Sequence, residues 1–194
     1  MKRLSIFPIL IIFLALLFCI VPSLRASEGN RLDVDVHLGL LSGAGVSYDA
    51  ESWQFGLDLE TPFPIHCIVD GIAGQIFNDL TFWEGFKLGL TDFFGADIYT
   101  YLRLLGNRGC RLYAGFDIIF GTEPAIKSFE AVLRPTTKIV FDLGEKTSLF
   151  LAGGFSLLSM VYVPGFEKPM IRIPNVSYNS VLTGCRAGLS FRIK

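Results

Sequence analysis

The sequence of 194 residues has little of what several common protein classes require. It contains only two histidines and four cysteines, their spacing fits no zinc site, and no phosphate-binding or calcium-binding loop is present. Basic residues are not in surplus, since the formal net charge is −1 at pH 7, whereas a nucleic-acid-binding surface needs a basic excess. We therefore expect no cofactor, no metal site and no nucleic-acid partner.

Long hydrophobic runs are also missing after residue 27, where no stretch reaches the roughly 18 apolar residues of a membrane-spanning helix. Nevertheless the chain is apolar, with 51% hydrophobic and only 18% charged residues and a mean hydropathy of +0.50. Such a composition without spanning helices leaves two broad options. The chain forms either a soluble domain with a dense core or a barrel whose apolar face meets lipid.

The N-terminal region has the features of a secretion signal. Two basic residues open the chain, an apolar stretch follows over Ile6–Val21, and small residues come shortly after it. We expect residues 1–27 to be a signal peptide and residues 28–194 to form one β-barrel domain. An uncleaved N-terminal anchor helix is the alternative interpretation of the same stretch.

The last stretch of the chain, Asn179–Lys194, alternates in the way of a strand with one apolar face. Successive side chains of a strand point to opposite faces, so a period of two separates the two sets. The apolar set is Val181, Thr183, Cys185, Ala187, Leu189, Phe191 and Ile193, and the other contains Ser180, Gly184, Arg186, Gly188, Ser190 and Arg192.

A shorter pattern, formed by Arg186, Gly188, Phe191 and Ile193, overlaps the end of this strand. It resembles the C-terminal signal on the last strand of bacterial outer-membrane β-barrels, which the barrel-assembly machinery reads. The usual version ends on the last hydrophobic residue, whereas here Lys194 follows. We expect these four residues to act as an assembly signal.

Seven further stretches alternate similarly and are expected to be strands. They are Arg31–Tyr48, Trp53–Glu60, Phe86–Thr91, Ala96–Leu104, Arg111–Phe120, Phe129–Leu143 and Ser148–Leu158. With the C-terminal stretch they give eight strands, joined by turns or short loops, which is typical of an antiparallel up-and-down barrel. The last strand should pair with the first to close the barrel, and Pro135 predicts a bulge or bend because it cannot donate a ladder hydrogen bond.

The segment Thr61–Glu84 interrupts this rhythm. Two prolines end the preceding strand, and apolar residues then recur every fourth position, which predicts a short helical or irregular segment near 62–84. If both termini face the periplasm, this segment falls on the periplasmic side, which is atypical. The loops at Asp49–Ser52, Gly121–Ala125 and Ser159–Tyr178 are then expected on the exterior side.

The side of each strand that meets lipid decides between the two options. In a membrane barrel the apolar set points outward and the polar set fills the lumen. Here the polar set contains charges of both signs interspersed with glycine, which suits a narrow lumen filled with ion pairs. Its charged members are Asp33, Asp35, Asp58, Glu60, Lys87, Asp97, Arg103, Arg111, Asp117, Glu130, Arg134, Lys138, Asp142, Arg186 and Arg192.

Within this set we expect a lumen charge network, in which Arg186 and Arg192 lie on the same inner wall as the acidic residues of the first strand. The expected members are Asp33, Asp35, Arg103, Arg111, Asp117, Arg186 and Arg192. Aromatic residues at the outward positions near strand ends suit girdles at the membrane interfaces. These are Trp53, Phe55, Phe116, Phe120, Phe141 and Phe191.

Over Arg31–Lys194 the chain thus resembles the small eight-stranded outer-membrane barrels of the OmpA-transmembrane and OmpW-like kind, in its architecture and terminal pattern. The resemblance implies residence in the cell outer membrane, contact with outer-membrane lipid and insertion by the barrel-assembly machinery. The functions of such barrels range from envelope anchoring and adhesion to uptake of small hydrophobic compounds, and the fold does not select among them.

Three functional hypotheses follow. The first is a non-enzymatic barrel with a structural or surface role, and the second is a narrow, porin-like conduit for small, apolar molecules. The third is a secreted soluble barrel that binds a small hydrophobic ligand. A lipid-acyl-modifying enzyme has the least support, because His37 falls in the lumen without a serine at a suggestive spacing and His66 lies in the irregular segment.

Overall fold

The structure, a computed structural model, describes residues 30–90, 93–106, 109–123, 127–166, 168–172 and 184–193. The expected signal peptide at residues 1–27 lies outside the described residues. The elements in chain order are β1 (Arg31–Gly39), β2 (Ser42–Ala50), β3 (Trp53–Thr61), α2 (Ile65–Phe77), α3 (Phe82–Gly89), β4 (Phe94–Gly106), β5 (Cys110–Glu123), β6 (Ser128–Asp142), β7 (Thr147–Gly154), β8 (Leu158–Tyr162), β9 (Met170–Arg172) and β10 (Arg186–Arg192).

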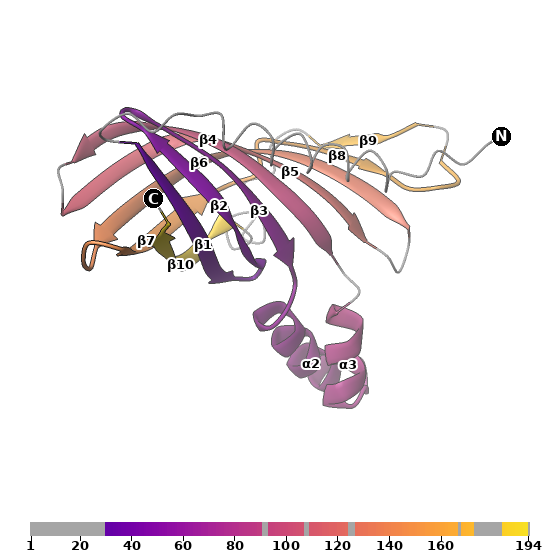
Figure 1. Ribbon diagram of the computed structural model, residues 1–194. Coiled ribbons are helices and arrows are strands. Elements are labelled where there is room, and N and C mark those ends of the chain that lie inside the picture. The colour runs from indigo at the N-terminus through magenta and orange to yellow at the C-terminus, as the bar shows by residue number, and fades with distance from the viewer. Residues whose placement is uncertain are drawn as a thin grey trace. The chain divides into compact units, whose positions relative to one another are not determined.

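Eight of these strands form a closed antiparallel ring (Figure 1). Its order is β1-β2-β3-β4-β5-β6-β7-β10, and β10 pairs with β1 with Asp33 opposite Arg192. The predicted fold class is therefore confirmed, as an all-β, eight-stranded antiparallel barrel that also carries two helices. The predicted pairing of the last strand with the first is confirmed as well.

The expected first strand, Arg31–Tyr48, is wrong, because it consists of two strands with a turn between them. The pairing of β1 with β2 sets His37 opposite Gly43, so residues of the same parity face each other. The alternation of apolar and polar residues consequently continues through the turn without a change of phase. Leu40 and Leu41 at the turn are apolar, so the usual polar turn residues did not indicate it either.

The expected strand Phe86–Thr91 is also wrong, since Phe82–Gly89 forms the helix α3. The helix begins at a capping box, in which the Glu84 backbone N–H donates to the Thr81 hydroxyl and the Thr81 backbone N–H donates to the Glu84 carboxylate. The hydrogen bonds that Thr81 donates to the Glu84 carboxylate hold the pKa of Glu84 below its usual range. The bond from the Thr81 backbone N–H contributes most to this shift, and the bond from its side chain contributes next. The predicted helix in the preceding segment is confirmed as α2.

Pro135 marks an irregularity, but in the neighbouring strand rather than its own. On one side β6 pairs with β7 up to Thr136 opposite Gly154, and pairing resumes with β8 at Leu133 opposite Leu158. The pairing along this side of β6 therefore breaks between β7 and β8 at Pro135, which has no backbone N–H to donate. The stretch Ser159–Tyr178, expected to be irregular, contains most of β8 and all of β9, which form a hairpin, and its residues 173–178 lie outside the described residues.

The two rims of the barrel differ in their connections. The rim that carries Arg31 and Arg192, here called the terminal rim, also carries the β2–β3, β4–β5 and β6–β7 turns. The opposite rim, here called the loop rim, carries the β1–β2 turn, the α2–α3 segment, the β5–β6 connection and the β8–β9 hairpin. The expected sides of Thr61–Glu84 and Asp49–Ser52 are therefore wrong. Because the expected first strand is two strands, these two connections lie at the opposite rims from those expected. Because Phe86–Thr91 is not a strand, all later connections lie at the expected rims.

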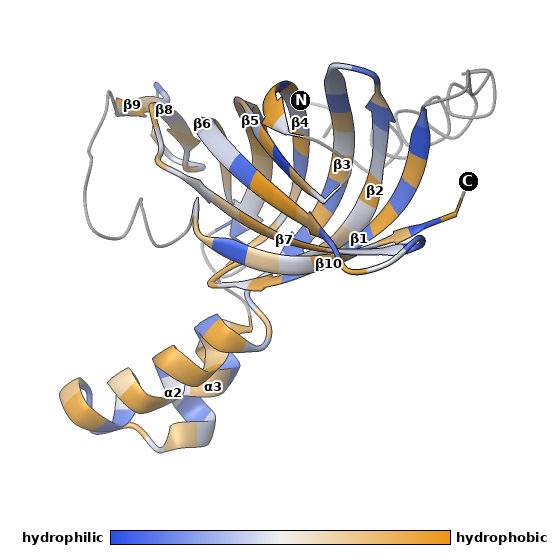
Figure 2. Cartoon of the chain, turned by 90° about the vertical axis from the view of Figure 1, so that its left-hand side faces the viewer, coloured by the Kyte–Doolittle hydropathy of each residue, from blue (hydrophilic) through white to orange (hydrophobic). Residues whose placement is uncertain are grey.

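The outward positions of the ring strands carry mainly apolar side chains and the inward positions mainly polar ones, with Ile119, Val140 and Phe150 as buried apolar exceptions. Leu38 is 55% exposed and Phe116 is 49% exposed, whereas Asp35 and Asp117 are both 0% exposed. Figure 2 shows the same arrangement as hydrophilic and hydrophobic residues alternating along the strands. The predicted orientation of the two strand faces is confirmed.

The helices α2 and α3 pack through small residues. The buried positions of α2 are Cys67, Gly71 and Gly74, and those of α3 are Gly85 and Gly89. A Cβ atom on Gly85 would lie 3.0 Å from the Cα of Gly71 and closer still to the Asp70 carbonyl. The two helices approach so closely that no side chain fits between them at this point.

We expect Gly85→Leu to separate α2 from α3, because the atoms in the way belong to the backbone and cannot rotate aside. Amide hydrogen exchange in α2 and α3 should become faster while exchange in the strands stays unchanged. Gly144→Ala is the matched control, since nothing lies within 4 Å of a Cβ there. Unchanged exchange in both helices of the Gly85→Leu protein contradicts the close packing.

Candidate functional site: a buried ionic network

Arg186, the first residue of β10, lies at the centre of a cluster of carboxylates inside the barrel. Its Nη1 atom is 2.6 Å from Asp97 Oδ2, 3.2 Å from Glu60 Oε1 and 3.7 Å from Asp58 Oδ2. Its Nη2 atom is 3.2 Å from Asp117 Oδ2. One guanidinium from β10 thus joins carboxylates from β3, β4 and β5 across the lumen.

Hydroxyl groups add hydrogen bonds to two lumen carboxylates, Asp117 and Asp35, whereas one buried oxygen each of Asp58, Glu60 and Asp97 has no hydrogen-bond partner among the described residues. The Tyr101 hydroxyl donates to Asp117 Oδ1 and accepts a hydrogen bond of 2.9 Å from Arg186 Nη2. Thr136 donates to Asp117 Oδ2 at 2.8 Å, and Tyr99 donates to Asp35 Oδ2 at 2.9 Å. Charged groups in a water-poor interior need such partners, because an unpaired one costs several kcal/mol.

Two further cations flank the Arg186 cluster from β6. Arg134 Nη1 is 4.0 Å from Asp117 Oδ2, and Lys138 Nζ is 3.7 Å from Asp35 Oδ2. The Lys138 ammonium also lies 4.3 Å from the centroid of the Phe150 ring, within the range of a cation–π contact. Positive charge therefore reaches the carboxylates from β6 as well as from β10.

His37 lies in the lumen, as predicted, beside the same cluster. Its Nδ1 atom is 3.5 Å from Asp58 Oδ2 and its Nε2 atom is 3.9 Å from Glu60 Oε1. Its ring meets Phe150 edge to face, with centroids 6.4 Å apart. Among the described residues, no hydroxyl or thiol makes a hydrogen bond to either ring nitrogen, so His37 does not form the nucleophile–base pair of a serine or cysteine hydrolase.

A second ionic cluster lies nearer the terminal rim, centred on Arg111 of β5. Arg111 Nη2 is 2.6 Å from Asp142 Oδ1, and its Nη1 is 3.1 Å from Asp49 Oδ2. Asp142 also accepts hydrogen bonds from Ser148, at 2.6 Å, and from Arg31, at 3.5 Å. This cluster connects residues of β1, β2, β5, β6 and β7.

Glycines on the inner wall provide the space that the aromatic rings of the lumen occupy. A Cβ atom on Gly188 would lie 2.5 Å from Cζ of Phe150, and one on Gly56 would overlap the Tyr99 ring. Tyr99 in turn stacks on Tyr101 with ring centroids 4.9 Å apart. The expectation that lumen glycines leave room in a narrow interior agrees with this packing.

The structure brings most of the expected network residues together, and two of them differ from the expectation. Arg192 shares the inner wall with Asp33 but is only half-buried. Arg103 is exposed, so its expected place in the network is wrong. It lies next to a register shift between Arg103 and Leu105 and just past the end of β3, which places it on the terminal rim. The buried members are Asp33, Asp35, Arg111, Asp117 and Arg186.

The network also contains buried residues that the sequence analysis did not select. Each lies at an inward position of its strand. Periodicity placed all of them except Asp49, expected in an exterior loop, in the lumen, but it could not show which of them would meet across it. The strand register and the diameter of the ring determine that. They are Asp49, Asp58, Glu60, Asp97, Tyr99, Tyr101, Tyr113, Arg134, Thr136 and Lys138.

The four residues of the expected assembly signal fall on or just after β10. Arg186 and Gly188 face inward, where one binds carboxylates and the other accommodates the Phe150 ring. Phe191 is 43% exposed and Ile193 is 64% exposed on the outer side. Their recognition by an assembly machinery stays a prediction.

Two other kinds of site have no candidate in the part of the chain that the structure describes. No set of three or more His, Cys, Asp or Glu side chains there is arranged to hold a metal ion. No helix among those residues has the length and hydropathy needed to cross a membrane.

No protein-family model and no curated protein matches the chain. Among solved structures, the chain is similar to a major outer membrane protein from the bacterium Thermus thermophilus, with a TM-score of 0.37 and 13% identity over 85% of this chain and 100% of that chain.

We expect Arg186→Ala to destabilise the barrel by about 3–5 kcal/mol, because it leaves several buried carboxylates without their shared cation. Arg186→Lys should recover only part of this loss, since an ammonium cannot contact carboxylates on two sides as the planar guanidinium does. The measurement is urea unfolding of protein refolded in detergent micelles, which needs no assembly machinery.

Arg192→Ala is the matched control for this prediction, because Arg192 lies on the same strand and wall but is half-buried. Its cost should stay within about 1 kcal/mol. Equal losses for the two alanine variants contradict a central role of Arg186.

Proposed function

We propose that the protein is an integral outer-membrane β-barrel with a sealed lumen, which anchors the structures of its loop rim at the cell surface without conducting solutes. The observation that carries the proposal is the radial polarity of the ring. Ionic groups lie inside it and large apolar side chains lie outside. A water-soluble barrel has the opposite arrangement, because apolar surface is stabilised by removal from water.

The size of the outer apolar surface supports a lipid environment. Soluble monomers rarely expose contiguous apolar patches above a few hundred Å², yet each ring strand contributes outward apolar residues. Examples are Leu38 at 55%, Leu59 at 54% and Leu151 at 47% exposure. Six of the eight ring strands have between 9 and 15 residues, and a tilted strand needs about 9–11 to cross the hydrocarbon. The other two, β7 and β10, have 8 and 7 residues.

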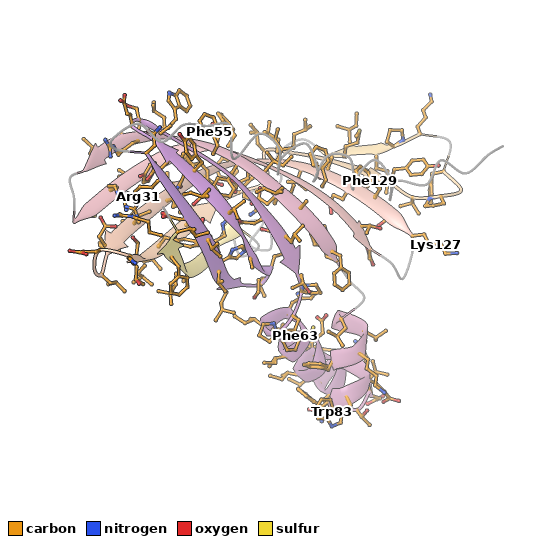
Figure 3. All side chains as sticks on the ribbon, viewed as in Figure 1. Arg31, Phe55, Phe63, Trp83, Lys127 and Phe129 are labelled. Carbon is orange, nitrogen blue, oxygen red and sulfur yellow. The ribbon has the colours of Figure 1, made fainter. Side chains whose placement is uncertain are left out.

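Exposed aromatic residues lie near both rims. Trp53 and Phe55 stack near the terminal rim, with centroids 6.2 Å apart, and Phe120 and Phe129 stack near the loop rim, with centroids 6.4 Å apart. Figure 3 shows Phe55 and Phe129 toward opposite ends of the barrel. Two such girdles are typical of outer-membrane barrels, in which aromatic rings lie at the level of the lipid headgroups. Phe116, expected in a girdle, lies in the middle of β5.

The filling of the lumen favours a structural or surface role over a conduit. Tyr101 and Tyr113 are 0% exposed, Phe150 is 2% exposed, and the Arg186 and Arg111 clusters cross the interior at two levels. The interior of an eight-stranded barrel is just wide enough for side chains to fill it. Passage of even a small apolar molecule would require these ion pairs to separate.

The proposal includes two partners, outer-membrane lipid around the ring and the barrel-assembly machinery. The pattern Arg186, Gly188, Phe191 and Ile193 supports the second, because it ends the strand that closes the ring. A small hydrophobic ligand stays an alternative partner that belongs to the conduit hypothesis.

Membrane integration is tested on the full-length protein expressed in a bacterium with an outer membrane. We expect it to stay in the membrane fraction after carbonate extraction and to migrate differently on a gel before and after boiling, as a closed barrel does. In planar bilayers the purified protein should give no conductance steps. Recovery as a soluble, detergent-free monomer rejects the membrane proposal, and regular conductance steps reject the sealed lumen.

The connections of the two rims indicate the orientation. Bacterial outer-membrane barrels have short periplasmic turns and longer extracellular loops. The terminal rim carries only tight turns between consecutive ring strands, whereas the loop rim carries the two helices and the β8–β9 hairpin. The terminal rim therefore faces the periplasm and the loop rim faces the exterior.

Orientation is tested with single cysteines at Glu51, on the terminal rim, and at Lys168, beside the β8–β9 hairpin, in a protein whose exposed Cys110 and Cys185 are replaced by serine. A bulky maleimide that cannot pass porins should label Lys168→Cys in intact cells. It should label Glu51→Cys only after the outer membrane is permeabilised. The reverse pattern contradicts the assigned orientation.

A further inference from the structure

The helix pair α2–α3 has its large apolar residues on the outside. In a water-soluble helix pair, the apolar stripes face each other and polar residues face water. Here the closest contacts between the helices are made by glycine and cysteine, with the Phe82 ring lying against Gly71, whereas Ile72 is 48%, Ile76 is 65% and Phe77 is 78% exposed. Figure 2 shows α2 as predominantly hydrophobic.

The exposed apolar residues of α2 form one continuous stripe. Counted from Ile65 they recur at spacings of three, four, seven and eleven residues, which is one face of a helix with 3.6 residues per turn. The members of this stripe, here called the α2 stripe, are Ile65, Ile68, Val69, Ile72 and Ile76, each at least 37% exposed. A surface of this kind is stable only against another apolar phase.

The packing between the helices points to lipid as that phase. Helices surrounded by lipid gain nothing from hiding leucine or isoleucine from water, so they associate through small residues that let the backbones approach. Gly71, Gly74 and Gly85 make this kind of contact, with a Cβ on Gly74 only 3.3 Å from the Cα of Gly85.

The ionisable residues of the pair lie away from the α2 stripe, whereas the uncharged Gln75, seven residues after Ile68, is exposed at its edge. His66 and Asp70 of α2 form an ion pair of 3.2 Å at the flank of the helix. On α3, Glu84 and Lys87 are exposed at positions that do not contact α2. The pair therefore has an apolar side on α2 and a narrow polar side on α3, where Glu84 and Lys87 lie between the exposed Trp83 (66%) and Leu88 (55%).

The α2 stripe continues the apolar outer surface of the ring. Leu59, at the end of β3, is 54% exposed, and Phe63, between β3 and α2, is 51% exposed and packs edge to face on Phe86 with centroids 6.4 Å apart. On the return to the ring, Phe94 of β4 is 44% exposed. Short connections thus tie the helix pair at both ends to the surface that the proposed function places in lipid.

We propose that the α2–α3 pair is a membrane-surface element, whose α2 stripe inserts into the acyl-chain region of one leaflet beside the barrel. This inference rests on the proposed function, since it needs the ring to be in the bilayer. Thirteen residues of α2 span only about 20 Å as a helix, short of the roughly 30 Å of the hydrocarbon core. The helix therefore lies along the leaflet and does not cross it.

The test uses the full-length protein refolded into phosphatidylcholine vesicles whose acyl chains carry bromine, which quenches tryptophan on contact. Both native tryptophans are replaced, as Trp53→Phe and Trp83→Phe. Single tryptophans are then introduced as Ile72→Trp in the α2 stripe, Lys87→Trp on the polar side of the same helix pair, and Phe116→Trp on the outer surface of the ring. Heat-modifiable migration verifies that each variant has folded.

We expect Ile72→Trp to emit at short wavelength and to be quenched as strongly as Phe116→Trp, and several-fold more than Lys87→Trp. Ile76→Trp, one turn further along the stripe, is a second reporter with the same expected result, and it replaces Ile72→Trp if that variant does not fold.

Three other outcomes overturn the inference in different ways. If Phe116→Trp is not quenched, the ring is not in lipid and the proposed function fails. If Phe116→Trp is quenched while Ile72→Trp behaves as Lys87→Trp does, the ring is in lipid but the α2 stripe faces water. If Ile72→Trp emits at short wavelength without being quenched, protein covers the stripe, as in contact with a second copy of the chain.

Discussion

The structure depends on the pairing of ionised groups inside a closed ring. A guanidinium or carboxylate that water cannot reach is stable only next to a group of opposite charge or a hydrogen-bond donor. Arg186 meets carboxylates of three other strands, and Arg111 meets those of two more. The contacts of Arg186 form only when β10 has closed on β1, so closure of the ring and satisfaction of these buried charges are coupled.

This coupling also determines what the lumen can do. A cross-lumen ion pair occupies the middle of the cylinder, and the aromatic rings that stack around it fill the remainder where glycines of the wall leave space. Gly56 beneath Tyr99 and Gly188 beneath Phe150 are such positions. Under the function proposed above, the lumen provides cohesion, and the outer surface and the two rims are the parts that contact other molecules.

Strand periodicity predicted the fold and the inner wall because the radial arrangement repeats at every second residue. The same signal could not locate the turn after Gly39, because pairing of like parity keeps the alternation in phase across it. It also wrongly predicted a strand over Phe86–Thr91, because a few residues there alternate between apolar and polar. The capping box at Thr81 and Glu84 was the sequence signal for the helix that is present. Arg103 was misplaced because a local register shift is not encoded in periodicity. Contacts such as Arg186 with Asp97 depend on shear and diameter, which no single strand specifies.

The helix pair follows a different rule from the ring, although both have apolar surfaces. In the ring, backbone hydrogen bonds between strands hold the structure, so the outward side chains can all be large. Two short helices satisfy their backbones separately and are held together by contact between their surfaces alone, and glycine at that contact lets the two backbones approach closely, as is typical of helices in lipid. The close contact of Gly71 and Gly74 with Gly85 leaves the isoleucines of α2 on the outside of the helix pair. It therefore corresponds to the arrangement in the strands, whose apolar side chains also face outward. Under the two proposals made above, lipid around both parts accounts for both arrangements.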